Sequence, residues 1–248
     1  MKSKKLILII PGILSLFALA SCGNKNTKSV IEDDDIAVEA LAYYEYSFDK
    51  EERTVTLDEY LGGTQDIEVP GVIGTYTVTK IGASCFKGKA ITAVTIPDTI
   101  VSIGNAAFVN NYIESVVVPD SVVEFGEDVF FAPGIVKPRL ESAIIGSGIK
   151  TLSARTFKGC TALTDVCLPD GLELIDTEAF SGCNALRSLV IPSSVKMIRT
   201  MAFDGCTSFE HIYYTGSESD WNKMFCDDLY NEAFVNAEIT FNYIRSEE

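Results

Sequence analysis

The feature of this sequence that most limits its fold is a phrase that recurs about every 23 residues. "IDTEAFSGCNAL" begins at Ile175, and "IRTMAFDGCTSF" begins at Ile198. The phrase is marked by a phenylalanine whose successive spacings are 22, 22, 27, 23 and 23 residues, at Phe86, Phe108, Phe130, Phe157, Phe180 and Phe203. A unit repeated at such a period cannot bury its apolar side chains alone, so it predicts one layer of a stacked array.

Each repeat predicts one coil of the chain. In "DVCLPDGLELI", Val166 and Leu168 alternate with other residues and predict a short strand. Proline then ends the strand because it has no N–H to donate. The corresponding corner residues are Pro97, Pro119, Gly146, Pro169, Pro192 and Thr215. Apolar residues three and six places after each corner, and the small residue before each phenylalanine, favour a tight return leg. We therefore expect an α/β solenoid with a parallel sheet on one face, and the six phenylalanines inside it.

Cysteine shares the period of the repeat. Cys160, Cys183 and Cys206 occupy the same place in consecutive coils, and Cys85 stands where other coils have alanine. Stacked side chains point in parallel, which leaves their β-carbons too far apart for an easy disulfide. We expect free, buried thiols that pack as small apolar groups.

Alternation along the predicted strands places two rows of side chains on the outer face of the sheet. The first row is mainly apolar and contains Thr95, Val117, Ile144, Cys167, Val190 and Tyr213. The second is mainly small and polar, and beside Ala93 it contains Ser115, Ser142, Asp165, Ser188 and His211. A contiguous exposed apolar row is typical of an interaction site. The other interpretation is that β-branched residues here merely favour the strand.

The two ends of the repeat region, residues 66–214, predict caps. Alternating apolar residues in 41–65, among them Tyr44 and Tyr46, indicate a β-hairpin at the N-terminal end. In 215–248, Ser217 and Asp220 fit a capping box. A helix through Trp221, Met224 and Phe225, then a strand from Ile239, would complete the C-terminal cap.

The first residues predict export. Residues 1–21 begin with lysines and continue with a short apolar stretch, which Pro11 and Gly12 interrupt, as in a signal peptide. The end of this stretch, Leu19-Ala20-Ser21-Cys22, resembles the lipobox of bacterial lipoproteins. That resemblance implies cleavage before Cys22 and attachment of lipid to it. Residues 22–40 then form a flexible acidic tether, in which Asp33–Asp35 is a solvated charge run and not a calcium loop.

Composition argues against several functions. A net charge of −15 repels phosphate backbones and anionic lipid, so we expect no nucleic-acid partner and membrane contact through the lipid anchor only. The single histidine, His211, falls on an outward strand position and cannot form a zinc site alone. The sequence has no G-x-S-x-G, H-E-x-x-H, P-loop or dinucleotide fingerprint. We expect no catalytic residue, no metal, no cofactor and no enzyme activity.

The repeat pattern L-x-x-V-x-I-P-x-x-V-x-x-I-x-x-x-A-F-x-G-C resembles the BspA-like, or Treponema-type, leucine-rich repeat over about Asp66 to Tyr214. The resemblance implies a right-handed solenoid with short helical turns on the return side. It also implies a secreted or surface protein, because several members are adhesins that bind host matrix or serum proteins. The third coil departs from the pattern: "FAPGIVKPRLES" adds residues, and we expect a protruding loop there.

These observations support two functional hypotheses. In the first, the protein is exported, anchored by lipid to the bacterial cell envelope and exposed on the cell surface. Its two outward rows then bind a protein or glycan of a host or a neighbouring cell. In the second, the solenoid is a structural spacer or assembly module of the envelope and binds no such ligand.

Overall fold

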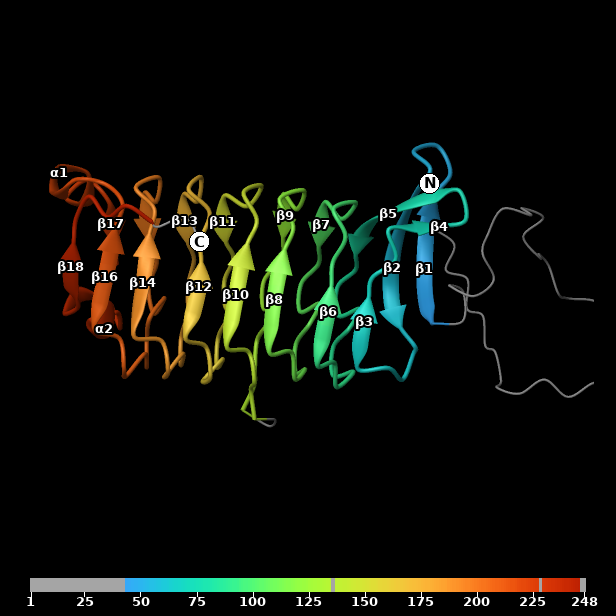
Figure 1. The fold of residues 1–248 in the computed structure, drawn as a ribbon, viewed down its shortest axis with the longest axis horizontal. Coiled ribbons are helices and arrows are strands. Elements are labelled where there is room, and N and C mark those ends of the chain that lie inside the picture. The colour runs from blue at the N-terminus through green and yellow to red at the C-terminus, as the bar shows by residue number, and fades with distance from the viewer. Residues whose placement is uncertain (1–42, 135–136, 228, 246–248) are drawn as a thin grey trace, which may run out of the picture.

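The computed structural model describes residues 43–134, 137–227 and 229–245. The expected signal peptide, Cys22 and the tether lie outside these residues. The described chain winds into a long solenoid in which strands of successive coils lie side by side (Figure 1). The expected parallel sheet on one face is confirmed.

The front face of the solenoid carries one strand from each coil. Cross-strand pairs such as Ile144↔Val117 and Ile144↔Cys167 are parallel and in register. β6 also lies beside β8, and β12 beside β14, so the paired groups form one continuous face (Figure 1). The strands are β3 (Asp66–Glu68), β6 (Ala93–Thr95), β8 (Ser115–Val118), β10 (Ser142–Ile145), β12 (Asp165–Cys167), β14 (Ser188–Ile191), β16 (His211–Tyr214) and β18 (Glu238–Thr240).

The return side is built from short strands and turns, so the helical turns expected there are wrong for the described residues. The strands are β1 (Tyr44–Asp49), β2 (Thr54–Tyr60), β4 (Val72–Ile73), β5 (Tyr76–Ile81), β7 (Ser102–Ile103), β9 (Glu124–Phe125), β11 (Thr151–Leu152), β13 (Leu174–Ile175), β15 (Met197–Ile198) and β17 (Phe225–Cys226). β1 pairs antiparallel with β2, and β4 with β5, whereas the other return pairs are parallel.

A left-handed residue two places before each phenylalanine explains the absence of helix. These residues have φ between 57° and 60°, and they are Ser84, Ala106, Asp128, Arg155, Glu178 and Met201. A helix needs consecutive negative φ values, so one such residue ends it. The reversal instead allows an N–H to bond along the solenoid axis: Phe157 donates to the carbonyl of Ala179 at 2.8 Å, and Phe180 to that of Ala202 at 2.8 Å.

The six repeat phenylalanines form a continuous stack inside the solenoid, as expected. All six are buried. Successive ring centroids are 5.0, 5.6, 5.8, 5.5 and 5.2 Å apart, and each pair of rings is stacked. Phe234 continues the stack beyond Phe203, and the Tyr60 ring packs against Phe86 in a tilted arrangement at the other end. Each ring therefore fills the space against its neighbour, and no single coil has a complete core.

The repeated cysteines are free and buried, as expected, and each thiol donates to the coil before it. Cys160 Sγ lies 3.3 Å from the carbonyl oxygen of Phe130, Cys183 Sγ 3.2 Å from that of Phe157, and Cys206 Sγ 3.1 Å from that of Phe180. Asn111 takes the same place two coils before Cys160 and donates from Nδ2 to the carbonyl of Phe86 at 2.8 Å. A thiol here therefore satisfies a buried carbonyl.

Both ends of the repeat region continue the sheets, since β2 pairs in parallel with β5 at the N-terminal end and carries β1 as an antiparallel partner. After α1 (Glu218–Trp221), β17 pairs with β15; after α2 (Glu232–Val235), β18 pairs with β16. Ser217 and Asp220 form the predicted capping box. The helix ends at Trp221, however, so the expected continuation to Phe225 is wrong. Phe225 lies on β17 with its side chain exposed.

The insertion in the third coil lies before β10. Its described parts extend past the neighbouring corners at that edge of the sheet (Figure 1). Arg139 stacks over the Tyr112 ring and pairs with Glu114 at 3.4 Å, while Leu140 is buried. The loop is thus fastened to the preceding coil where it rejoins the sheet.

Substitution of Phe180 by alanine tests the stack. Because Phe180 contacts a phenylalanine on either side, we expect Phe180→Ala to lower the free energy of unfolding by about 3–5 kcal/mol. Phe225→Ala is the control, since Phe225 is 58% exposed, and it should change stability by less than about 0.5 kcal/mol. Urea unfolding of both variants gives the comparison. Equal stabilities would contradict the interior role of the stack.

Candidate binding surface

The structure places the eleven predicted front-face residues in two straight rows. Ser115, Ser142 and Asp165 pair in register along one row, and Val117, Ile144 and Cys167 along the other. Ser188 pairs with His211, and Val190 with Tyr213, which continues both rows. Thr95 ends β6 in the row of Val117. The rows lie on the outer side of the sheet, since the alternating residues between them are largely buried.

Two further strands extend these rows beyond the predicted ones. β3 pairs with β6 and adds Asp66 and Glu68, while β18 pairs with β16 and adds Glu238 and Thr240. β3 is followed by a corner proline, Pro70, with Ile73 three places on, whereas β18 is followed by Asn242 at the corner position. The alternation in Asp66-Ile67-Glu68 and in Glu238-Ile239-Thr240 is the signal that could have identified both. The face is therefore acidic at each end.

The mainly apolar row is exposed in its first half and partly covered in its second. Val117 is 56% exposed and Ile144 is 49% exposed. Cys167, Val190 and Tyr213 occupy the same register but are only half-exposed. The difference arises because the chain after β18 turns back over the second half of the face.

Residues 241–245 form this cover, which we call the C-terminal strap. Its backbone joins the solenoid where Asn242 donates to the carbonyl of Gly216 at 2.9 Å and Tyr243 donates to that of Tyr214 at 3.0 Å. The Tyr243 ring centroid lies 4.7 Å from that of Tyr213. The guanidinium of Arg245 donates to the carbonyl oxygen of Leu168, at 3.1 Å from both Nη1 and Nη2, and Nη1 lies 3.2 Å from Cys167 Sγ.

His211 lies on the face in a polar setting. Its Nε2 is 2.9 Å from Thr240 Oγ1, its Nδ1 is 3.6 Å from a Glu238 carboxylate oxygen, and its ring packs 4.4 Å from the Tyr213 centroid. Nε2 therefore has a hydrogen-bond partner, and a carboxylate lies near Nδ1. Within the described part of the chain, no group of three or more His, Cys, Asp or Glu side chains could hold a metal ion.

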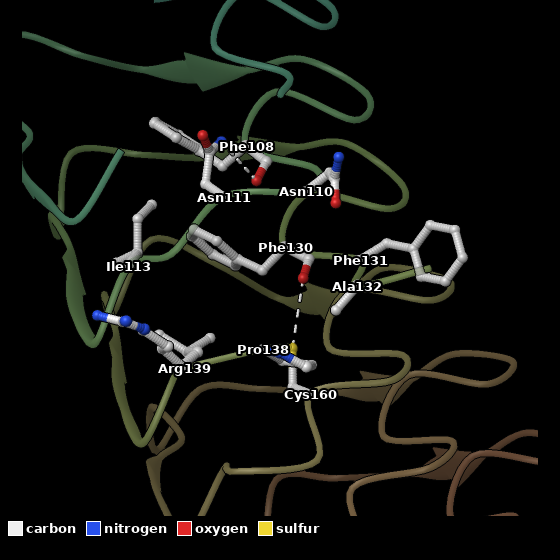
Figure 2. A pocket seen from close by; sticks show the side chains of 11 residues that line it. Phe108, Asn110, Asn111, Ile113, Phe130, Phe131, Ala132, Pro138, Arg139 and Cys160 are labelled. Carbon is white, nitrogen blue, oxygen red and sulfur yellow. Dashed lines mark hydrogen bonds between the residues drawn. The ribbon is translucent and has the colours of Figure 1, made fainter. Parts of the chain in front are cut away.

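The hollows of the described surface are small or shallow. One lies between the third coil and its insertion, where Phe108, Phe130, Pro138 and Arg139 face one another around about 20 Å³ (Figure 2). That volume holds one water molecule. A second, open depression at the N-terminal end is lined by Glu45, Asp58 and Lys87, with Lys89 and Glu59 paired at 2.9 Å. Neither hollow brings a nucleophile together with a base.

Burial in apolar surroundings disfavours the thiolate form of the four buried cysteines. Burial raises the pKa of Cys160 and that of Cys206 to about 12, and it also raises the pKa of Cys85 and Cys183. A thiol reacts as the thiolate, which is scarce far below the pKa. Cys167 and Cys226 are half-exposed.

These environments predict which cysteines react in the folded protein. At pH 8 without denaturant, we expect iodoacetamide to modify Cys167 and Cys226, and to leave Cys85, Cys160, Cys183 and Cys206 unmodified until urea unfolds the chain. Mass spectrometry of the digested protein measures each site. Rapid modification of Cys183 in the folded state would show that the thiol row is not interior.

The described residues contain no helix with the length and apolar character that a membrane span requires.

Comparison with solved structures finds bacterial leucine-rich repeat proteins. One is the leucine-rich repeat protein of T. pallidum, with 20% identity and a TM-score of 0.45, covering 75% of this chain and 80% of that one. A protein from Bacteroides ovatus has 22% identity and a TM-score of 0.46, over 74% of this chain and 55% of that one. A protein from Eubacterium ventriosum has 24% identity and a TM-score of 0.49, over 66% and 50%. No curated protein matches.

The repeat itself is matched by a family pattern. Six copies of the BspA type leucine rich repeat region match across residues 79–210 and 136–247. These ranges cover more than half of the chain and coincide with the stacked coils. The family suggests a protein-binding solenoid, and such solenoids are generally not enzymes. This protein belongs to the BspA type leucine-rich repeat family.

Proposed function

We propose that this protein is an exported lipoprotein of the bacterial cell envelope, exposed on the cell surface, whose front face binds a protein or glycan of a host or neighbouring cell. The observation that carries the proposal is the exposed pair Val117 and Ile144, adjacent on β8 and β10. Contiguous exposed apolar surface often marks an interaction site. The flanking serines offer hydroxyl groups beside this apolar strip.

The geometry suits recognition of a large partner. The face consists of three hydrogen-bonded groups of strands that lie side by side across many coils. The two described hollows are a one-water cavity and an open depression at the N-terminal end. A flat, rigid sheet orders few side chains on binding, which lowers the entropic cost of association. Binding through repeated shallow contacts is the expected mode.

The second candidate is a spacer or assembly module of the envelope. Inter-coil ion pairs favour a stiff rod: Arg155 donates to Asp128 and Glu127, each at 2.7 Å, and Arg199 lies 3.4 Å from Asp176. A spacer would use this stiffness and would not use the exposed apolar pair. The two candidates therefore make opposite predictions for substitutions on the front face.

Charge on the exposed pair separates the candidates. The wild-type chain is first screened against a panel of immobilised extracellular-matrix and serum proteins to find the partner that it binds. We expect the double variant Val117→Asp, Ile144→Asp to bind that partner at least about tenfold more weakly, a loss of about 1.4 kcal/mol in binding free energy. Val123→Asp is the matched control, because Val123 is 63% exposed and lies outside the front face. Surface plasmon resonance measures binding, and circular dichroism verifies the fold. Unaltered binding by the double variant, or no binding by the wild type, favours the spacer.

Lipid attachment at Cys22 has its own test. Several acyl chains on one residue hold a protein stably on a membrane, since each buried methylene contributes about 0.8 kcal/mol. We expect wild-type protein from cells to enter the detergent phase on Triton X-114 partition and Cys22→Ser protein to remain in the aqueous phase. Protease treatment of intact cells should release the wild-type solenoid. Detergent partition of Cys22→Ser equal to that of the wild type would refute the anchor.

A further inference from the structure

The corner prolines remove hydrogen-bond donors from one edge of the front sheet. Thr215, the corner residue after β16, donates its N–H to the carbonyl of Ile191 in the preceding coil at 3.1 Å. Pro192 stands at the same corner one coil earlier, and Pro169 one coil before that. Proline has no N–H, so the ladder supplies no such donor to Leu168 or to Ile145. Buried carbonyls of this kind are normally satisfied by another group.

The C-terminal strap supplies that group to Leu168. Both Nη atoms of Arg245 donate to this carbonyl at 3.1 Å. Tyr243 and Arg245 face the sheet, whereas Ile244 between them is 87% exposed, which is the alternation of an extended segment. The protein thus shows how a strand-like segment with an arginine sits on its own front face: the arginine takes the carbonyl opposite a corner proline, and an apolar ring covers the row beside it.

The same arrangement recurs, uncovered, one coil earlier. Ile144 pairs in register with Cys167, so Ile145 corresponds to Leu168 and its carbonyl faces Pro169. The Ile144 side chain beside it is exposed, and Val117 continues the row. We call this place the vacant seat: the carbonyl of Ile145 with the side chains of Ile144 and Val117.

Charge around the vacant seat is mainly negative, and the nearby cation is Lys150, whose Nζ lies beside Gly171. Asp120 and Asp170 follow the corner prolines on the coils to either side, and both are exposed. Asp120 accepts a hydrogen bond from the N–H of Ser147 at 2.7 Å, which lowers the pKa of its carboxyl and keeps it ionised. Glu141 and Asp165 add exposed carboxylates at the opposite end of the strands. Guanidinium is the cation that can donate several N–H groups at once to such acceptors.

Resting on the proposed function, we propose that the vacant seat binds an extended, arginine-bearing segment of a partner protein, in the manner in which Tyr243 and Arg245 cover β12 to β16. A glycan is disfavoured because the aromatic side chain of the row, Tyr213, is already stacked by Tyr243. The occupant is therefore a polypeptide whose arginine meets the carbonyl of Ile145 and whose neighbouring apolar side chain covers Ile144.

The first experiment tests the seat within the chain. Arg245→Ala removes the donor, and Pro192→Thr returns an N–H to the carbonyl of Leu168, as Thr215 does for Ile191. Each should raise the rate of iodoacetamide modification at Cys167 several-fold in the full chain, with Cys226 as the internal reference. Melting curves verify that both variants fold. Unchanged modification of Cys167 in both variants would overturn the role of the proline-opposed carbonyl.

The second experiment tests the vacant seat with a defined probe. The probe is a fluorescent peptide of the strap sequence, ITFNYIRSEE, and its partner is the same peptide with alanine in place of arginine. We expect the arginine peptide to bind the full chain at least about tenfold more tightly than the alanine peptide. Pro169→Thr returns the missing N–H, and Ile144→Lys places a like charge beside the arginine, so each should remove that preference. Val123→Lys, outside the front face, should leave it intact. Fluorescence anisotropy measures the binding of both peptides to the wild-type chain and to each of the three variants.

The outcomes are separable from those of the adhesion assay. Equal binding of the two peptides, or full retention of the preference by both Pro169→Thr and Ile144→Lys, overturns the inference. Light scattering that shows a dimer lost in Pro169→Thr would assign the seat to a second copy of this chain and overturn a separate partner. If the peptide preference holds but no matrix or serum protein binds, the adhesin proposal fails and the arginine seat stands.

Discussion

The stacking of one coil on the next is the interaction on which the rest of the structure depends. Each coil contributes one phenylalanine ring, one front strand and one return leg, and none of these is complete without a neighbour. Backbone bonds run along the axis on the front face, on the return side and at the left-handed turns. The thiol of Cys183 adds a fourth contact of the same direction. Ion pairs also join neighbouring coils: Lys158 pairs with Glu178, and Lys196 pairs with Glu173.

The corner prolines show how one requirement of this fold creates an opportunity for function. Proline follows β6, β8, β12 and β14 and ends these front strands. Proline at a corner also lacks the N–H that would donate to the preceding coil, as the comparison of Pro192 with Thr215 shows. The edge of the sheet therefore carries acceptors that the repeat itself does not satisfy. An acidic solenoid with such an edge is suited to a cationic donor, and Arg245 is the example within this chain.

Much of this fold could be predicted from the sequence because the period carries the information. The spacing of Phe157, Phe180 and Phe203 fixes the interior, and alternation before each corner fixes which residues face outward. The left-handed turns could not be predicted, because Glu178 and Met201 are residue types that seldom adopt positive φ, and only the stacked neighbour explains why they do. The strap was also missed. Its contact joins Arg245 to Cys167, 78 residues apart, between a repeating and a non-repeating segment, and no period links them.

The strap also bears on how specificity arises on such a face. A surface of serine, valine and isoleucine on a flat sheet discriminates weakly, since apolar contact is not directional. A hydrogen bond to a carbonyl that lacks its ladder donor is directional. It forms only with a donor placed at one distance from the apolar row. The two kinds of contact lie side by side at Ile144 and Ile145, so a segment must satisfy both to bind well. Thr215 shows the contrast, because its N–H supplies the donor that a corner proline lacks, and the carbonyl of Ile191 is then no longer open to an arginine.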